Sequence, residues 1–290
     1  MLPLSFDLAL DVQRFRREVK GGLLNNKRAK SLLMRKYGID ERAAKAIIAY
    51  FREQERYSTV PPDDETVLVE EVEKDNTYEY FFHTLIGRRA NDALSRAFAY
   101  AVGRWKGGVN VGIALNDNGF LLRVPKEARL SENEIMELFQ LEDLREILKR
   151  ALDNTELLKR RFRHVANRGG FLILRRYVGR SKRLGRQQVI AVSLLKVLKE
   201  HYPDFPLLKE VYREIMEDKM DVENAELFLS WVREGGKIKV VFERNELPSP
   251  FAFNLEAIGS SDVVLMEDRR EMIKALHRKI MALIGGENAT

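Results

Sequence analysis

One amphipathic helix flanked by strand-like segments does most to constrain the fold of this chain. From Gly87 to Trp105, apolar residues recur at the i, i+3, i+4 and i+7 positions. This stripe is typical of a helix that packs on a sheet. Residues 66–73 and 78–85 precede the helix and are rich in β-branched and aromatic side chains, which predicts two strands.

Two further strand-like segments follow the helix. Residues 109–115 and 119–124 are separated by a turn that ends in Asn118-Gly119. Asn-Gly predicts a β-hairpin because both residues tolerate positive φ. The order β-β-α-β-β therefore predicts an α+β fold, with a small antiparallel sheet and a packed helix.

Helical patterns lie on both sides of this unit. Residues 6–20, 23–37 and 40–56 predict three short helices, which fit a helix-turn-helix and a plain helical bundle equally well. Two prolines in residues 58–64 force extended backbone, so we place a boundary there. Further helices are predicted near 131–139, 141–152, 155–168, 186–201, 206–218, 221–234 and 267–283, with a short strand at 237–242. The predicted parts are a helical, helix-turn-helix-like segment at 1–60, an α+β unit at 61–125 and a mainly helical region at 126–290.

Composition excludes several classes of protein. The chain of 290 residues has no cysteine, which excludes disulfides, a thiol nucleophile and cysteine-based metal centres. No apolar run approaches about 18 residues, and Asp7 and Asp11 interrupt the apolar core of a signal peptide, so we expect a cytoplasmic protein without a membrane partner. Charged residues make up 32% of the chain and glutamines are few, as expected of a thermophile. No P-loop, nucleophile elbow or kinase signature is present, so we assign no catalytic residue and no cofactor to this chain.

Residues 157–199 contain no acidic side chain. Thirteen lysines and arginines fall in this window, whereas the whole chain has a net charge of only +6, so the basic character is local. A sustained field of one sign usually meets a polyanion, most often a nucleic-acid backbone. The region 126–290 is therefore predicted to bind nucleic acid.

The first helix in this window, residues 157–168, is amphipathic. Its apolar residues share one face, and Arg160, Arg163 and Asn167 project from the opposite face. Guanidinium groups suit phosphate oxygens because each can donate two parallel hydrogen bonds. The alternative is a solvated basic face that pairs with acidic residues elsewhere. No acid follows Glu156 on this helix, so local i,i+4 pairs cannot satisfy the arginines.

A basic loop between glycines follows that helix. Glycine amides and a basic loop before a helix can form an anion site at the helix N-terminus. The tyrosine in this segment would either stack on a base or be buried with its hydroxyl hydrogen-bonded. The candidate nucleic-acid contacts here are Arg168, Arg175, Arg176, Tyr177, Lys182, Arg183 and Arg186.

The helix that begins at Gly87 carries a second basic stripe. Arg89, Arg96 and Tyr100 lie opposite its apolar face, and Arg88 flanks them. These four residues are also candidate nucleic-acid contacts. If this stripe faces the acid-free window, the two would line a groove. Otherwise it is an ordinary amphipathic surface.

Acidic residues gather in and around the first two strands. Paired carboxylates can hold Mg²⁺ for nuclease chemistry. No compact motif is present, however, and alternating acids are common on exposed strand faces, so we assign no metal ligand. The residues concerned are Asp63, Asp64, Glu65, Glu70, Glu71, Glu73, Asp75 and Glu79.

Six segments are informative when they are read together. They are HTLIGRRANDALSRAFAYAVGRW (83–105), VNVGIALNDNGFLL (109–122), RRFRHVANRGGFLILRR (160–176), the segment 186–222, SPFAFNLE (249–256) and DRREMIKAL (268–276). In this order they resemble the C-terminal DEAD/H-associated region of the Lhr-type large helicases, from about Ala43 to Leu283. Members of that family are superfamily 2 motors with two RecA-like lobes that bind ATP, followed by a winged-helix domain and this region.

The resemblance implies a role in gripping the tracking single strand during 3′-to-5′ unwinding. It also implies functions in DNA repair or in handling RNA–DNA hybrids. Both motor lobes are absent from this sequence, so ATP and Mg²⁺ are expected only for lobes supplied in cis or in trans. We therefore predict an accessory module that grips single-stranded DNA or RNA through backbone contacts. The alternative is a protein-interaction module that docks a separately encoded helicase ATPase.

Overall fold

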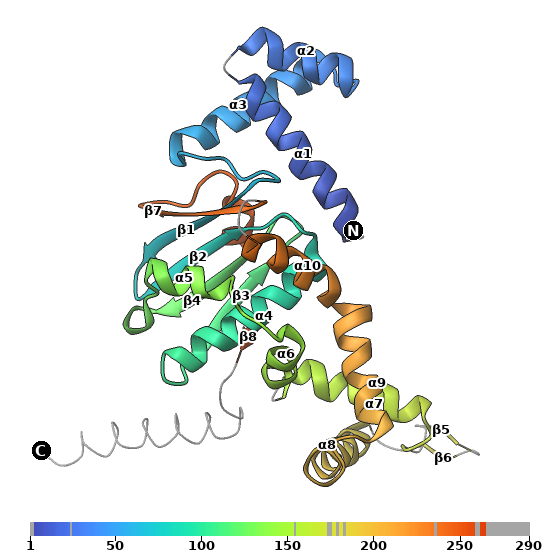
Figure 1. Ribbon diagram of the computed structural model, residues 1–290. Helices are drawn as coiled ribbons and strands as arrows, with labels where there is room; N and C mark the ends of the chain where they lie inside the picture. Colours follow the sequence, from blue (N-terminus) through green and yellow to red (C-terminus); the bar gives the residue numbers. More distant parts are fainter. Residues whose placement is uncertain are drawn as a thin grey trace, which may run out of the picture.

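The computed structural model describes residues 3–23, 25–153, 155–172, 176–177, 180–181, 184–234, 237–258 and 262–264. Three parts follow one another across the molecule: N-terminal helices, a central sheet with helices on its faces, and a helical arm (Figure 1). The helix predicted at 267–283 lies outside the described residues.

The N-terminal part confirms the three predicted helices. Each begins at a side chain that accepts a backbone hydrogen bond from the first turn, namely Ser5, Asn25 and Asp40. Their small core includes Phe51, which packs edge-on against Phe251 from the C-terminal part of the chain. The helices are α1 (Phe6–Gly22), α2 (Asn26–Lys36) and α3 (Glu41–Tyr57).

The central sheet contains the predicted β-β-α-β-β unit and two more strands. Its described strands are β1 (Thr66–Lys74), β2 (Thr77–His83), β3 (Val111–Leu115), β4 (Phe120–Pro125), β7 (Lys239–Asn245) and β8 (Asp262–Val264). Their order is β7-β1-β2-β4-β3-β8, and all neighbours are antiparallel except β1 and β7, which are parallel. The α+β class is confirmed. The predicted antiparallel β-β-α-β-β unit is present. The parallel pairing of β7 with β1 extends this unit and was not predicted, because the partner of an isolated strand cannot be read from its own sequence.

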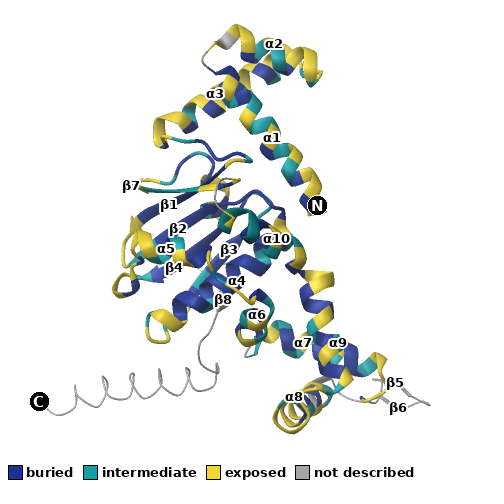
Figure 2. Ribbon diagram, in the orientation of Figure 1, coloured by how far each residue is buried: buried dark blue, intermediate teal, exposed yellow. Residues whose placement is uncertain are grey.

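Helix α4 (Arg88–Trp105) lies on one face of the sheet, as its apolar stripe predicted. The ring of Phe98 lies 5.7 Å from the rings of Phe82 and Phe120, and these two stack on each other at 4.7 Å. Helix α11 (Phe253–Ile258) covers part of the other face. The buried residues of the sheet and of α4 form the main core (Figure 2).

The hairpin between β3 and β4 is confirmed, although the role of its glycine differs from the prediction. Leu115 pairs with Phe120, and the Asn116 side chain accepts hydrogen bonds from the backbone of the turn. Gly119 does not have a positive φ. A Cβ atom at this position would instead collide with the carbonyl oxygen of Phe82. Glycine is needed here because two strands approach closely.

The remaining helices connect the sheet to the arm. They are α5 (Glu132–Leu138), α6 (Leu144–Leu152), α7 (Glu156–Arg168), α8 (Leu184–His201), α9 (Pro206–Arg213) and α10 (Val222–Arg233), with a π-helical turn η2 (Glu214–Lys219) after α9. Helices α6 and α10 pack on α4, whereas α7 packs on α8 and α9. A short hairpin of β5 (Arg176–Tyr177) and β6 (Arg180–Ser181) lies at the far end (Figure 1). We call α7, α8, α9, η2 and this hairpin the arm.

The division into three parts at residues 60 and 125 stays a prediction. Strands β7 and β8, from the C-terminal part of the chain, belong to the same sheet as β1–β4. Across the described ranges, no helix has the combination of length and apolar sequence that crossing a membrane requires.

Candidate nucleic-acid interface

Helix α7 presents its basic side chains from a firmly packed position. Thr155 caps its N-terminus by accepting a hydrogen bond from the backbone of Leu158 at 3.2 Å. The predicted apolar face is confirmed, since Leu158, Phe162, Val165 and Ala166 are buried.

A basic pocket of about 580 Å³ opens along α7. Three arginines line it, and Lys219 lines it from η2. The other residues that line it are Leu157, Arg160, Arg161, His164, Asn167 and Arg168. We call this the α7 pocket. It concentrates three guanidinium groups and an ammonium group around one opening, which suits a phosphate diester.

One buried carboxylate orients two of these arginines. Glu214, at the start of η2, is 4% exposed, and its Oε2 lies 3.0 Å from Nη1 of Arg161. Its Oε1 accepts a hydrogen bond from Arg168, whose side chain is 63% exposed. These two arginines of α7 therefore pair with a carboxylate from another element. Arg160 is exposed and has no ion pair with any residue that the structure describes.

His164 is the titratable member of the pocket. Partial desolvation and then the charges of Arg163 and Arg161 hold its pKa below the ordinary value for histidine. The imidazole is therefore neutral at pH 7, and a bound phosphate would favour its protonated form.

The structure places the predicted α7 contacts only partly together. Arg160, Asn167 and Arg168 line the α7 pocket, whereas Arg163 does not. Asn167 also accepts a hydrogen bond from Gln187 of α8 at 3.0 Å. The sequence prediction missed Arg161 and Lys219 as pocket residues and left His164 unassigned. Lys219 of η2 lines one side of the pocket, and the helical periodicity of α7 cannot reveal that contact.

The basic loop is described only in part. Arg175, Lys182 and Arg183 lie outside the described residues. The backbones of Arg176 and Tyr177 form β5, and the backbone of Arg186 belongs to α8. Their roles remain predictions.

The predicted basic stripe on α4 is not a single solvent face. Arg96 is 7% exposed and its Nε lies 2.7 Å from Oδ1 of Asp92. Tyr100 is half-buried against the core, and Arg88 is exposed. Helices α6 and α10 pack on α4 and leave little of its surface free, and the nucleic-acid contacts suggested on this helix stay predictions.

Arg89 of α4 joins the sheet to the arm. Its Nη2 donates hydrogen bonds to the backbone oxygens of Glu217 and Met220, the latter at 2.9 Å. The backbone oxygen of Arg89 accepts a hydrogen bond from Asp221 at 3.2 Å. Helix α4 therefore contacts η2, which also contributes Lys219 to the α7 pocket. Arg89 holds the backbone at the end of η2 in place.

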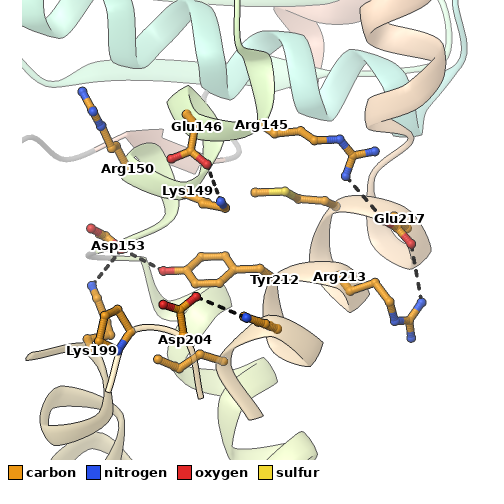
Figure 3. A pocket seen from close by; sticks show the side chains of 14 residues that line it. Arg145, Glu146, Lys149, Arg150, Asp153, Lys199, Asp204, Tyr212, Arg213 and Glu217 are labelled. Atoms are coloured by element: carbon orange, nitrogen blue, oxygen red, sulfur yellow. Dashed lines mark hydrogen bonds and ion pairs between the residues drawn. The ribbon is translucent and has the colours of Figure 1, made fainter. Parts of the chain in front are cut away.

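A second charged pocket of about 600 Å³ lies between α6, α9 and the end of α8 (Figure 3). Asp153 bridges its walls, with Lys199 Nζ at 2.8 Å and the Tyr212 hydroxyl at 3.0 Å. Arg145 and Glu217 form a further ion pair at 3.4 Å across it. Most of its charges neutralise each other, so the α7 pocket is the better candidate for a polyanion.

The acidic strands use their carboxylates to bind neighbouring side chains. Oε1 of Glu70 lies 2.6 Å from Nε2 of His83 and also accepts a hydrogen bond from the Ser249 hydroxyl. Burial alone would raise the pKa of Glu70, but these hydrogen bonds outweigh it and hold the pKa below its ordinary value. Among the described residues, no group of His, Cys, Asp and Glu could hold a metal ion.

Comparison with known proteins identifies the family. The family model described as DEAD/H associated matches residues 61–252. The chain belongs to the DEAD/H-associated family. The predicted resemblance to the C-terminal DEAD/H-associated region of Lhr-type helicases is thereby confirmed.

Relatives of this DEAD/H-associated chain are much longer proteins. It is 74% identical over 285 residues to ATP-dependent helicase Lhr-Core protein 2 of Thermococcus barophilus. It is 45% identical over 283 residues to the ATP-dependent helicase Lhr-Core of Methanocaldococcus jannaschii. Both matches cover 98% of this chain and 32% of the relative, so the chain spans about a third of their length.

A solved structure shares the fold. The helicase Lhr of Mycobacterium smegmatis, determined bound to ssDNA and AMP-PNP, matches with a TM-score of 0.65 and 23% sequence identity. The match covers 88% of this chain and 32% of that chain.

Proposed function

We propose that this chain grips single-stranded nucleic acid through the sugar–phosphate backbone, as an accessory region of an Lhr-type helicase. The observation that carries the proposal is the α7 pocket, where Arg160, Arg161 and Arg168 face Lys219. A translocating helicase must hold any sequence, so contacts to phosphate should dominate over readout of base edges. The ssDNA in the structure of the M. smegmatis Lhr is consistent with this role.

The activity of the whole helicase belongs to the same proposal. Binding and hydrolysis of ATP with Mg²⁺ would be performed by RecA-like lobes in cis or in trans, and no residue of this chain is assigned to them. The helicase would act in DNA repair or in the handling of RNA–DNA hybrids. A cytoplasmic location and a thermophilic source stay predictions.

A salt titration tests the proposal. The affinity of the chain for a labelled single-stranded oligonucleotide should fall steeply as salt rises, because bound phosphates release counterions. Arg160→Ala should weaken binding equally on all sequences and reduce the salt slope by about 0.7, the value for one phosphate on a single strand. Fluorescence anisotropy at four or more salt concentrations measures both quantities.

A matched variant makes the test local to the arm. Arg52 is exposed and has no ion pair with a described residue, and its helix, α3, lies at the opposite end of the molecule from the arm (Figure 1). Arg52→Ala should leave affinity and salt slope unchanged. No binding at low salt would refute the proposal, and equal losses in both variants would move the binding surface away from the α7 pocket.

One observation favours docking of a separately encoded helicase ATPase as a second candidate. Helix α8 exposes apolar side chains, including Val189 at 66%, Val197 at 46% and Val192 at 44%. Exposed apolar residues that gather on one helix are typical of a protein contact surface. Co-purification with RecA-like lobes, lost on Val189→Lys and Val192→Lys, would support this function.

A further inference from the structure

A half-exposed aromatic ring lies at the end of α7, beside the α7 pocket. Phe171 is 51% exposed, and it follows the Gly169-Gly170 turn in which Gly170 adopts a φ of +76°. The backbone N–H groups of Phe171 and Leu172 both donate to the carbonyl oxygen of Ala166, at 2.9 and 3.2 Å. The turn therefore holds this side chain in one place rather than leaving it on a free loop.

Neighbouring residues fix the orientation of the ring. Phe205 meets Phe171 edge-on, with ring centroids 5.5 Å apart and an interplanar angle of 82°. A Cβ atom on Gly169 would lie only 3.1 Å from Cδ2 of Phe171, so the ring packs closely over that glycine. Edge-on support of this kind orients an aromatic ring and still leaves area for another flat group.

The ring borders a pocket of about 480 Å³ whose walls are mainly apolar. Its apolar lining includes Val165, Phe171, Phe205 and Leu207, and Arg168 also lines it. Arg168 also lines the α7 pocket, so one residue borders both an apolar pocket and a basic one. An apolar pocket next to a basic pocket matches the two parts of a nucleotide. The base is flat and has apolar faces, and one sugar links it to a phosphate.

Charge in the apolar pocket does not oppose a nucleotide. Its two carboxylates are Glu210 and Glu214. Glu210 accepts a hydrogen bond from Arg213 at 2.9 Å, and Glu214 binds Arg161 and Arg168. Each negative charge is therefore matched by a guanidinium group.

We propose that Phe171, supported by Phe205, stacks on an unpaired nucleobase whose phosphate is held in the α7 pocket. This inference rests on the proposed function and adds a base contact to the backbone contacts. Stacking suits a strand of any sequence because every base has a π-face. An apolar side chain of a protein partner would also fit the ring, but the basic residues beside it favour a polyanionic strand.

Abasic oligonucleotides separate stacking from phosphate binding. Phe171→Ala should weaken binding of an oligothymidine strand by about 5- to 100-fold, the range for one base–aromatic stack. The same substitution should have little effect on a strand of equal length in which every nucleotide is abasic, because that strand keeps its phosphates and lacks bases. The salt slope on oligothymidine should not change. Phe253→Ala on α11, where the ring is 63% exposed, is the matched control and should bind like the wild type.

A tryptophan provides a direct readout. Phe171→Trp should retain affinity, and its additional emission should be quenched by the normal strand and not by the abasic one. Thermal unfolding of each variant shows whether the fold is intact.

The outcomes distinguish this inference from the proposed function. No binding by the wild type at low salt overturns both. Salt-dependent binding that Phe171→Ala leaves unchanged overturns stacking alone and leaves the backbone grip standing. If Phe171→Ala loses equal affinity for normal and abasic strands, the base contact is also rejected. The base contact is likewise rejected if the normal strand fails to quench the additional emission of Phe171→Trp.

Discussion

Nη1 of Arg161 lies 3.0 Å from Oε2 of Glu214, a carboxylate that is 4% exposed. The two residues come from different elements, α7 and η2, so the ion pair joins the basic helix to the turn that carries Lys219. A buried carboxylate at this point orients the guanidinium groups around the α7 pocket and reduces their mutual repulsion.

Glu214→Gln should destabilise the arm. The neutral amide keeps the shape of the side chain but leaves two arginines without a negative partner, and we expect the free energy of unfolding to fall by about 1–3 kcal/mol. Chemical denaturation measures it. The matched control is Glu210→Gln, because Glu210 forms an exposed i,i+3 ion pair with Arg213 and its loss should cost less than about 1 kcal/mol. Similar losses in both variants would contradict a special role for Glu214.

Binding to single strands should tighten as the pH falls. Partial desolvation and the arginines of α7 lower the pKa of His164, so the free protein holds this imidazole neutral at pH 7. A phosphate in the α7 pocket favours the protonated form, so binding takes up a proton and strengthens by about 2- to 5-fold as the pH falls through that pKa. Anisotropy titrations that start above the ordinary histidine value of about 6.5 and continue well below it measure the effect.

Histidine variants assign this pH dependence. His164→Gln should remove it, whereas His201→Gln, on the exposed end of α8, should retain it. Identical pH profiles for His164→Gln and the wild type would show that His164 does not face the bound strand.

Arg89→Ala should affect stability rather than the salt slope. Its guanidinium group binds the carbonyl oxygens of Glu217 and Met220, and removing it leaves those groups unpaired, at a cost of roughly 1–3 kcal/mol. The exposed neighbour Arg88 serves as the control, and Arg88→Ala should change the unfolding midpoint very little. If Arg89→Ala instead lowers the salt slope by about 0.7 with unchanged stability, Arg89 contacts a phosphate.

Gly119→Ala should disrupt the hairpin between β3 and β4. The new methyl group would collide with the carbonyl oxygen of Phe82 on β2, and the backbone must move, at a cost of about 3 kcal/mol. Gly21 in α1 has no atom within 4 Å of an added Cβ, so Gly21→Ala should be neutral or slightly stabilising. Thermal melts of the two variants show whether the room available for the added Cβ atom, rather than the loss of a glycine itself, determines the change in stability.

Features within one helix or one hairpin were predictable from the sequence. The stripe on α4 and the apolar face of α7 depend on helical periodicity, which needs no knowledge of distant residues. Contacts between elements were not predictable. Arg96 is buried because other helices pack on α4, and Lys219 joins the α7 pocket because η2 folds back beside α7. A helical wheel shows which side of a helix is polar, but not which part of that side another element approaches.

The parallel pairing of β1 with β7 has a consequence for how the chain folds. Thr66 pairs with Lys239, so this edge of the sheet closes only after the entire arm has been made. Contacts between such distant residues form slowly because a long loop must close first. Until then β1 presents an unpaired edge, which is a template for intermolecular strand addition. A nascent chain truncated before β7 should therefore be prone to aggregation, and synthesis of the arm sets the interval during which this edge needs protection.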